Sequence, residues 1–329
     1  MHRKGWIKYF YYFRPFEFNA GVMPSITEDL KFFFSTIRKA FNLFQQNDPL
    51  RLAGATAFFT NFALPPILII LIRLFGMFTD RRLLATHLFE RLASILDDDS
   101  ILQIRTTLRN IRGIDQAWYV TFFSFIFFLF VATTLFNVIK NSLEQIWNIG
   151  QKDKKGIVNT LKSRAISVTI ILFAGILFFI GLLADSVQAY IGAYLKNGAP
   201  SFGLDLTSII NQLVFVIIVT TWFTILFRYL TNGRPTWRAA ISGGLLTGCL
   251  FTAGKYILRI LLPLSNISNI YGSAGSIIVI MLFVFYSSLI FYFGASFIKA
   301  LSVGRATPII PKNGSFAYEL TEVEPEKED

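Results

Sequence analysis

The sequence predicts an all-α fold, a polytopic membrane helical bundle with six transmembrane helices plus amphipathic interfacial helices. Six apolar runs are long enough to cross a bilayer, at residues 55–78, 118–139, 165–187, 207–230, 237–262 and 274–301. A hydrocarbon core of about 30 Å needs roughly 20 apolar residues in a helix, and each run provides them. Residues 122–131 are apolar on every side, whereas a helix of a soluble protein keeps a polar face. The composition agrees, because 53% of the residues are hydrophobic and 16% are charged.

The net charge of +11 is distributed in a way that indicates membrane topology. If the N-terminus lies in the cytoplasm, most Lys and Arg residues fall in segments on the cytoplasmic side, as the positive-inside rule requires. We therefore expect both termini to be cytoplasmic and the basic residues to contact anionic membrane lipids. A nucleic-acid partner is not expected from this distribution.

The segments outside the apolar runs divide the chain into four parts. Residues 1–24 form a basic, aromatic leader without a small-residue cleavage site, and residues 25–50 have the apolar periodicity of an amphipathic helix on the cytoplasmic surface. Residues 51–302 form the transmembrane domain. Residues 303–329 form an acidic tail that we expect to be disordered.

The long outer loop at residues 79–117 carries two further amphipathic stretches, at residues 84–96 and 101–111. We expect this pair of helices to lie outside the membrane and to cover the bundle as a lid. The acidic run Asp97-Asp98-Asp99 between them is compatible with calcium binding, but aspartates before a helix commonly cap its free N–H groups. We favour the cap.

The first span contains Pro65 and Pro66 near its middle. Two adjacent prolines remove two backbone donors, and in lipid the freed carbonyl groups must find other partners. Thr56, Thr60 and Asn61 just upstream add a polar interruption. The pair predicts a break in the helix, either a kink packed against neighbouring helices or a broken helix that lines a cavity.

The fifth span carries a seam of small residues that allows a neighbouring helix to approach closely, formed by Ala240, Gly244, Gly248 and Thr252. Lys255 and Arg259 continue this stripe on the helical wheel. Charged side chains inside a membrane cost free energy, so two cations on one membrane helix require an explanation. Extension of the long side chains to the lipid headgroups is one explanation.

Counting along each helix places Arg73, Asp185, Lys255 and Arg259 at about the same depth, near the outer boundary of the membrane. Three bases and one acid at one level suit an anionic headgroup or substrate. These residues are therefore the candidate anion- or lipid-binding site, and we expect a transport function between the first and fifth spans.

Catalytic chemistry has little support in the sequence. The histidines are His2 and His87, the one cysteine, Cys249, lies in a span, and neither a Gly-rich phosphate loop nor a metal-ligand spacing occurs. We therefore expect no enzyme activity, no cofactor and no metal. A polar group at the inner end of the second span is interpreted as capping and anchoring the helix, namely Asn137, Asn141, Ser142 and Glu144.

Three stretches resemble the YihY/BrkB family of bacterial inner-membrane proteins. They are RLAGATAFFTNFALPPILIIL at residues 51–71, NSLEQIWNI at residues 141–149, and YGSAGSIIVIMLFVFYSSLIFYFGAS at residues 271–296. The resemblance covers residues 30–302 and implies a six-span protein of the bacterial inner membrane. Members have carried a ribonuclease label, which the residues of this chain do not support. The family's last span often ends in Gly-Ala-Glu, where this chain has Ser296.

Some members of that family are associated with virulence and serum resistance, and some are suspected of handling envelope lipids or lipopolysaccharide precursors. The resemblance and the outer cations together lead us to expect a protein that transports or accommodates an anionic amphiphile or envelope lipid. The alternative is a non-catalytic membrane scaffold that docks envelope partners, or a second copy of itself, through the outer loop and the N-terminal helix.

Overall fold

The computed structural model describes residues 26–75, 85–86, 89–90, 98–112, 118–151, 169, 173, 176, 200–264, 271, 275–312 and 314–319. Most of these residues are helical. The long helices are α1 (Ile26–Gln46), α2 (Pro49–Phe75), α4 (Asp98–Arg112), α5 (Trp118–Trp147), α7 (Pro200–Tyr229), α8 (Trp237–Leu264) and α10 (Gly275–Gly304). Four short strands join them, namely β1 (Ile149–Gln151), β2 (Gly233–Arg234), β3 (Ile310–Pro311) and β4 (Ser315–Ala317).

Three of the described helices are long and apolar enough to span a membrane. The qualifying segments are Gln212–Tyr229 in α7, Trp237–Leu258 in α8 and Ile277–Gly304 in α10. Helices α2 and α5 coincide with the first two expected spans, and at about 1.5 Å per residue each exceeds the length that a bilayer requires. The expected third span, residues 165–187, lies almost entirely outside the described residues. A helical membrane bundle is thus supported, and the number of six spans stays a prediction.

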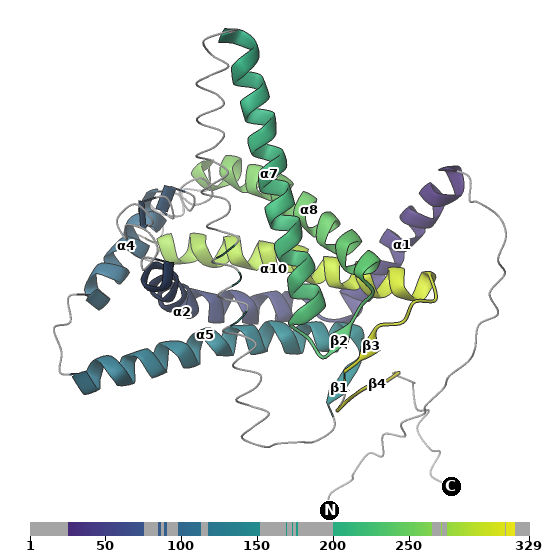
Figure 1. Ribbon diagram of the computed structural model, residues 1–329, viewed down its shortest axis with the longest axis horizontal. Helices are drawn as coiled ribbons and strands as arrows, with labels where there is room; N and C mark the ends of the chain where they lie inside the picture. Colours follow the sequence, from purple (N-terminus) through teal and green to yellow (C-terminus); the bar gives the residue numbers. More distant parts are fainter. Residues whose placement is uncertain are drawn as a thin grey trace, which may run out of the picture.

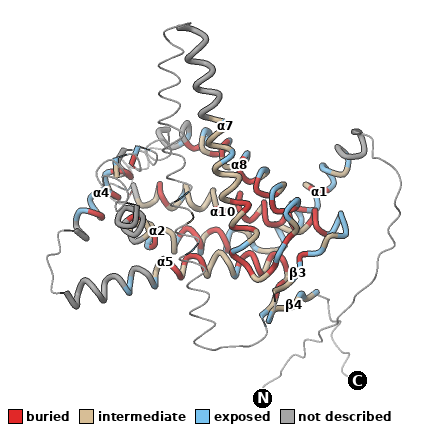
Figure 2. Tube along the Cα trace, in the orientation of Figure 1, coloured by how far each residue is buried: buried red, intermediate tan, exposed pale blue. Residues whose placement is uncertain are grey.

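Helix α10 runs through the middle of the bundle and contacts most of the other helices (Figure 1). Helices α2 and α5 pack against each other on one side of it, and α7 and α8 form a pair on the other. The buried residues gather where these elements converge (Figure 2). Phe227 of α7 stacks on Phe291 of α10 there, with ring centroids 4.8 Å apart. Aromatic packing therefore joins the two halves of the bundle.

Helices α7 and α8 are antiparallel neighbours that touch through small residues. A Cβ atom added at Gly244 would collide with Thr224 Oγ1 and lie 3.0 Å from the carbonyl oxygen of Thr220. One at Gly248 would lie 2.7 Å from Thr220 Oγ1. Gly244 and Thr224, which face each other, lie the same number of residues from Arg234 in the connecting turn, and so do Gly248 and Thr220. Two antiparallel helices joined by a short turn pair their residues in this way. The predicted seam residues Gly244 and Gly248 thus face α7.

The other side of α8 packs as closely on α10. A Cβ atom at Gly243 would collide with Ile298, and one at Gly294 would collide with Thr247 Oγ1. Helix α8 therefore needs small residues on two sides, because it is held between α7 and α10. Of the other seam residues, Ala240 is fully buried, and Thr252 donates to the carbonyl oxygen of Gly248.

One end of the bundle, which we call the strand end because β1 to β4 lie there, is tied together by a buried carboxylate. Glu144 near the end of α5 is 5% exposed, and its Oε1 accepts the backbone N–H of Asn232 at 3.0 Å. Its Oε2 accepts from Gln151 Nε2 at 3.1 Å, and Lys140 Nζ lies 3.9 Å from Oε1. This one side chain links α5, the strand β1 and the turn between α7 and α8.

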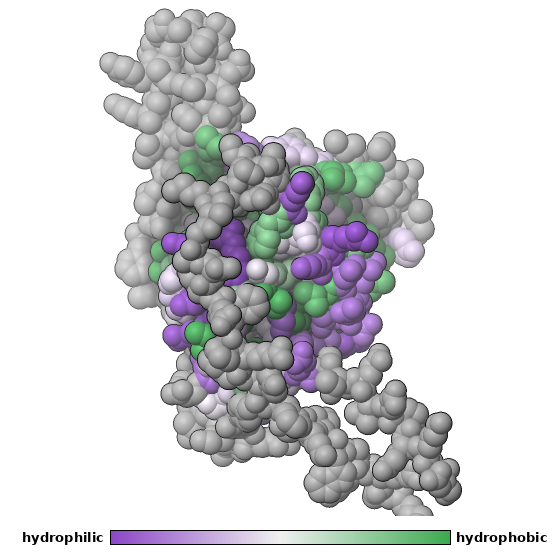
Figure 3. All heavy atoms as spheres, turned by 90° about the vertical axis from the view of Figure 1, so that its right-hand side faces the viewer, coloured by the Kyte–Doolittle hydropathy of each residue, from purple (hydrophilic) through white to green (hydrophobic). Residues whose placement is uncertain are grey.

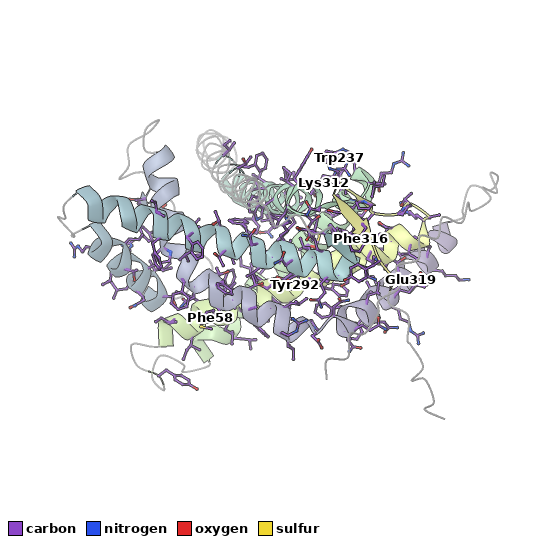
Figure 4. All side chains as sticks on the ribbon, turned by 90° about the horizontal axis from the view of Figure 1, so that it is seen from below. Phe58, Trp237, Tyr292, Lys312, Phe316 and Glu319 are labelled. Carbon is purple, nitrogen blue, oxygen red and sulfur yellow. The ribbon has the colours of Figure 1, made fainter. Side chains whose placement is uncertain are left out.

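Trp147 and two lysines extend these links to α10 and the C-terminal segment. Trp147 Nε1 donates to the carbonyl oxygen of Ala295 at 3.0 Å, and the carbonyl oxygen of Trp147 accepts from Lys299 Nζ at 2.7 Å. Lys312 Nζ donates to the carbonyl oxygen of Thr231 at 2.7 Å. We call these side chains the anchor cluster: Glu144, Trp147, Lys299 and Lys312. Figure 4 shows Lys312 at the strand end, beside Phe316 and Glu319.

The C-terminal segment corrects one expectation, because residues 303–329 were predicted to be a disordered tail. Helix α10 continues to Gly304, β3 pairs with β2, and β4 pairs with β1, both antiparallel. Phe316 packs over Gly150, where a Cβ atom would lie 2.5 Å from the ring, and burial raises the pKa of Tyr318. Pairing with distant loops orders this segment. Residues 320–329, which carry most of the acidic charge, lie outside the described residues.

The segments that were predicted to share the cytoplasmic side lie together. Helix α1, strand β1, the turn between α7 and α8, and the C-terminal strands are at the strand end, whereas α4 is at the opposite end (Figure 1). Figure 3 faces the strand end and shows hydrophilic side chains gathered among apolar ones. The relative sidedness of these segments agrees with the expected topology.

The close approach of α7 and α8 gives a prediction that compares two glycines. Gly244→Ala should destabilise the protein by about 1–3 kcal/mol, because the added methyl group overpacks the contact with Thr224. Gly54→Ala on α2 is the matched control, since nothing lies within 4 Å of its added Cβ atom and alanine favours the helix. Thermal unfolding in detergent should show a lower midpoint for the first variant and not for the second. Equal midpoints would show that the seam is not tightly packed.

The anchor cluster gives a second prediction. Glu144→Ala leaves the N–H of Asn232 without its acceptor, and we expect a destabilisation of about 1–3 kcal/mol. Glu144→Gln keeps an acceptor oxygen and should lose less. Asn141→Ala, an exposed position one turn earlier on the same helix, is the control. Unfolding in detergent measures all three, and a loss for Glu144→Ala no greater than that of the control would contradict the anchoring role.

Candidate functional site

A cavity of about 450 Å³ lies between α2, α4, α5 and α10. It lies away from the strand end. Figure 4 shows Phe58, one of its lining residues, farther from the strand end than Tyr292. Four helices contribute to its lining, which consists of Phe58, Phe59, Asn61, Phe62, Leu64 and Pro65 from α2, Gln103, Ile104 and Thr107 from α4, Phe127, Phe130, Val131 and Thr134 from α5, and Ile277 and Ile280 from α10.

The walls on α2 and α5 follow from helical spacing. Phe58, Phe62 and Pro65 are four and three residues apart, so they lie on one side of α2. The rings of Phe58 and Phe62 meet edge to face with centroids 5.0 Å apart. Both rings are about half exposed, as is Phe130 on α5. Exposed aromatic rings therefore form part of the cavity lining.

Pro65 of α2 lines the cavity, and the helix continues past both Pro65 and Pro66. Helix α2 is continuous from Pro49 to Phe75, so the predicted broken helix is not seen, and the predicted kink stays a prediction. Proline has no N–H, so the carbonyl groups of Asn61 and Phe62 lack the donors that Pro65 and Pro66 would otherwise supply. Asn61 and Phe62 line the cavity, and so does Pro65. The prolines therefore leave two backbone acceptors beside the cavity, while neighbouring helices hold α2 in shape.

The polar side chains of the lining are uncharged. Thr134 Oγ1 donates to the carbonyl oxygen of Phe130 at 2.7 Å, and Thr107 Oγ1 donates to that of Gln103 at 2.9 Å. Asn61 and Gln103 add side-chain amides. The described lining contains no Lys, Arg, His, Asp or Glu. Its chemistry suits a hydrocarbon chain that carries a neutral hydrogen-bonding group, such as an ester or an amide.

Helix α4 closes one side of the cavity. It begins at Asp98, within the aspartate run that was interpreted as a helix cap. Its residues Ile101, Ile104 and Leu108 are buried in a small core with Leu68, Phe89 and Ile280. Arg105 lies over the ring of Phe89, 4.7 Å from the centroid. The second half of the outer loop thus packs on α2 and α10, whereas most of the first predicted helix of the pair, residues 84–96, lies outside the described residues.

A buried hydrogen bond braces α2 against α10 between the cavity and the strand end. The hydroxyl oxygens of Thr56 and Tyr292 are 2.5 Å apart. Thr56 Oγ1 donates to the carbonyl oxygen of Leu52 at 3.0 Å, so Tyr292 is the donor in the pair. Thr60 likewise donates to the carbonyl oxygen of Thr56. Of the polar residues noted in the first span, Thr56 and Thr60 therefore have hydrogen-bond partners for their hydroxyl groups, and Asn61 lines the cavity.

Of the four predicted anion-binding residues, the structure describes the side chain of Lys255 alone, so their grouping stays a prediction. Lys255 is half-buried, with Nζ 4.2 Å from the ring centroid of Phe215 on α7. Arg73 and Arg259 lie on α2 and α8, but their side chains lie outside the described residues. Asp185 also lies outside them. Lys255 thus contacts α7 and not the cavity.

The cavity includes the first expected span, in α2, and not the fifth, in α8, so the expectation of function between these two spans stays a prediction. Helix α10 contacts both α2 and α8, and the cavity is formed on the α2 side by α2, α4, α5 and α10. The small residues of α8 let α7 and α10 pack closely against it.

The walls on α5 and α10 were not foreseen. Phe127, Val131 and Thr134 on α5 are four and three residues apart, so they lie on one side of the helix. The lining residues of α2 have the same spacing, and this spacing is the sequence signal of the two walls. Apolar residues on a membrane helix face lipid as readily as protein, so the pattern alone does not indicate a cavity.

Comparison with known proteins gives a family match. The family model described as "Virulence factor BrkB" matches residues 40–313. A UPF0761 membrane protein of Mannheimia succiniciproducens is 25% identical over 269 residues, which cover 78% of this chain and 86% of the relative. One of Aggregatibacter aphrophilus is 21% identical over 280 residues, covering 81% and 92%. One of Pseudomonas paraeruginosa is 27% identical over 192 residues, covering 58% of this chain and 44% of the relative, so the match spans less than half of that protein. No solved structure matches the chain.

The brace beside the cavity gives a third prediction. Tyr292→Phe removes the donor to Thr56, and Thr56→Val removes the acceptor. Each variant should destabilise the protein by about 0.5–1.5 kcal/mol. A double-mutant cycle measured by unfolding in detergent should show a coupling of similar size, because the double variant loses the same bond once. Additive losses would mean that the two hydroxyl groups contribute no shared hydrogen bond.

Proposed function

Since the chain belongs to the virulence factor BrkB family of membrane proteins, we propose that it accommodates or moves an anionic amphiphile, with a hydrocarbon chain held in the cavity. The observation that carries this proposal is the apolar lining with a rim of exposed aromatic rings. A volume of about 450 Å³ lies in the range of small-molecule sites. Envelope lipids are the amphiphiles that a membrane protein meets in highest amount.

Selection of a particular lipid must come from contacts other than hydrophobic burial. A chain that moves from the bilayer into the cavity exchanges one apolar surrounding for another, so the hydrophobic effect contributes little. Van der Waals contact with Phe58, Phe62 and Phe127 then favours occupancy. The amides of Asn61 and Gln103 can form hydrogen bonds with an ester or amide near the headgroup. A plain hydrocarbon has no group that forms such bonds.

In this proposal the charged headgroup of the amphiphile lies at the end of the bundle where α4 is. Helix α2 continues from Pro65 for about two turns to Arg73, which reaches that end. The exposed residues Arg105 and Arg109 lie on α4. These three cations are our candidates for contact with an anionic headgroup such as that of a lipopolysaccharide precursor. Lys255 and Arg259 on α8 have no role in this proposal.

We place the protein in the bacterial inner membrane with the strand end and both termini in the cytoplasm. The excess of Lys and Arg in the segments at that end supports this orientation. Helix α4 then lies on the outer side. The lining has no paired nucleophile and base among the described residues, so the proposed role is binding or transport and not catalysis.

A scaffold role is the second candidate, and one observation favours it. Helix α4 presents an exposed face away from the bundle, with Leu102 63% exposed beside Thr106 and Arg109. Such a face is available to an envelope partner or to a second copy of the chain. A scaffold would keep its function when the cavity is filled, which separates the two candidates.

A tryptophan placed in the cavity gives the fourth prediction. Thr134→Trp should fill the space that a lipid chain occupies, whereas Ile126→Trp on the same helix lies outside the lining and is the control. The protein is reconstituted in vesicles that contain a phospholipid with a photoreactive acyl chain. Peptide mass spectrometry should find crosslinks in α2 and α5 for the unmodified chain and for Ile126→Trp, and several-fold fewer for Thr134→Trp.

The same vesicles separate binding from transport. Movement of a fluorescent anionic lipid between leaflets should stop in Thr134→Trp and continue in Ile126→Trp. Unchanged crosslinking in Thr134→Trp would remove the cavity as the binding site. If Thr134→Trp loses crosslinking while lipid movement is unchanged, the cavity binds the acyl chain but has no part in transport.

A further inference from the structure

A second hollow, of about 280 Å³, lies between α1 and α10 and shares no residue with the cavity. We call it the α1–α10 groove. Its polar and apolar lining comes from both helices, with Lys39, Asn42, Leu43 and Gln46 on α1 and Lys299 and Val303 on α10. We infer that this groove binds the phosphate headgroup of an anionic membrane lipid at the strand end, a site distinct from the one proposed above.

The groove is held in shape by aromatic contacts between the two helices. Phe33 meets Phe297 edge to face with centroids 6.0 Å apart, and Phe44 meets Phe293 at 5.7 Å. These contacts lie before and after Lys39 along α1. The groove residues of α1 recur every three or four positions, so they share one side of the helix. The site is therefore formed before any ligand arrives.

The remaining surface of α1 places the groove at the level of the headgroups. Phe34 is 66% exposed and Phe41 50% exposed, and the exposed cations Lys31 and Arg38 lie on the same helix. Exposed aromatic rings beside cations are typical of a helix that lies in the membrane interface. Val303, 70% exposed, continues the apolar surface at the edge of the groove. A lipid can therefore place its phosphate in the groove and its chains along this apolar edge.

The donors of the groove match a phosphate group. Lys299 lines the groove, and its Nζ uses one of its three donors on the carbonyl oxygen of Trp147, which leaves two donors. Lys39 supplies a second cation from the facing helix, and the amides of Asn42 and Gln46 supply neutral donors. Phosphate oxygens accept such bonds, and lysine binds phosphate as a point charge.

The charge balance at Lys299 favours an added anion. The described lining of the groove holds two lysines, Lys39 and Lys299, and neither Asp nor Glu. Its net charge is therefore positive, and the charge of Glu319 offsets only part of it. A lipid with a net negative headgroup restores neutrality there, whereas a zwitterionic phosphatidylcholine brings its own cation.

The test measures lipid retention on the whole protein in a neutral detergent by native mass spectrometry, with phosphatidylglycerol and phosphatidylcholine titrated separately. We expect phosphatidylglycerol to bind more tightly than phosphatidylcholine. Lys39→Gln should weaken phosphatidylglycerol binding about tenfold, the loss of one hydrogen bond to a charged group. Lys31→Gln, another exposed lysine of α1 outside the groove, is the matched control and should change it less than about twofold.

Four outcomes would overturn the inference. They are equal binding by the unmodified chain and Lys39→Gln, equal losses in Lys39→Gln and Lys31→Gln, no preference for phosphatidylglycerol, and displacement of the lipid by inorganic phosphate at millimolar concentration. The last would assign the groove to a free phosphate. Lys39→Gln should leave acyl-chain crosslinking in the cavity unchanged, so this inference and the cavity proposal fail separately. Both lysine substitutions are at exposed positions, and the unfolding midpoint checks that each variant is folded.

Discussion

The arrangement of the helices depends on how the buried end of α5 is satisfied. Its last turn carries Glu144 and Trp147 into the protein, where an unpaired carboxylate or carbonyl group would be costly. Glu144 accepts from the turn between α7 and α8, and Trp147 exchanges hydrogen bonds with α10 through Ala295 and Lys299. Four helices are thereby fixed relative to one another at the strand end. Burial is concentrated there in Figure 2, and the cavity lies away from that end, between α2, α4, α5 and α10.

The membrane helices were the most predictable part of the molecule. Whether a run is long and apolar enough to span lipid is a local property, so α7, α8 and α10 fall where the sequence placed them. The seam on α8 was readable too, because close helix contact requires small residues at regular spacing. The ordered C-terminal segment was not, because its strands are two or three residues long and pair with loops far away in the sequence.

The candidate site was harder to predict for a physical reason. Charged residues stand out in a membrane span, and on that ground the sequence predicted a site at Lys255 with Arg73, Asp185 and Arg259. The cavity is lined by uncharged groups, and its aromatic residues resemble those that face lipid. Its existence depends on how α2, α5 and α10 sit relative to one another, which no single helix encodes. The prolines and the four-and-three spacing of the lining residues on α2 and α5 were the local signals of this site.

The most direct test of the cavity proposal is an electron-microscopy structure of the protein in lipid nanodiscs. Our account predicts elongated density in the cavity between α2, α4, α5 and α10, lying against Phe58 and Phe62 and ending near Asn61 and Gln103. It also predicts that the hydrogen bonds of Glu144 and Trp147 are intact in the same map. A cavity closed by side chains, or one filled by water in place of lipid, would contradict the central claim.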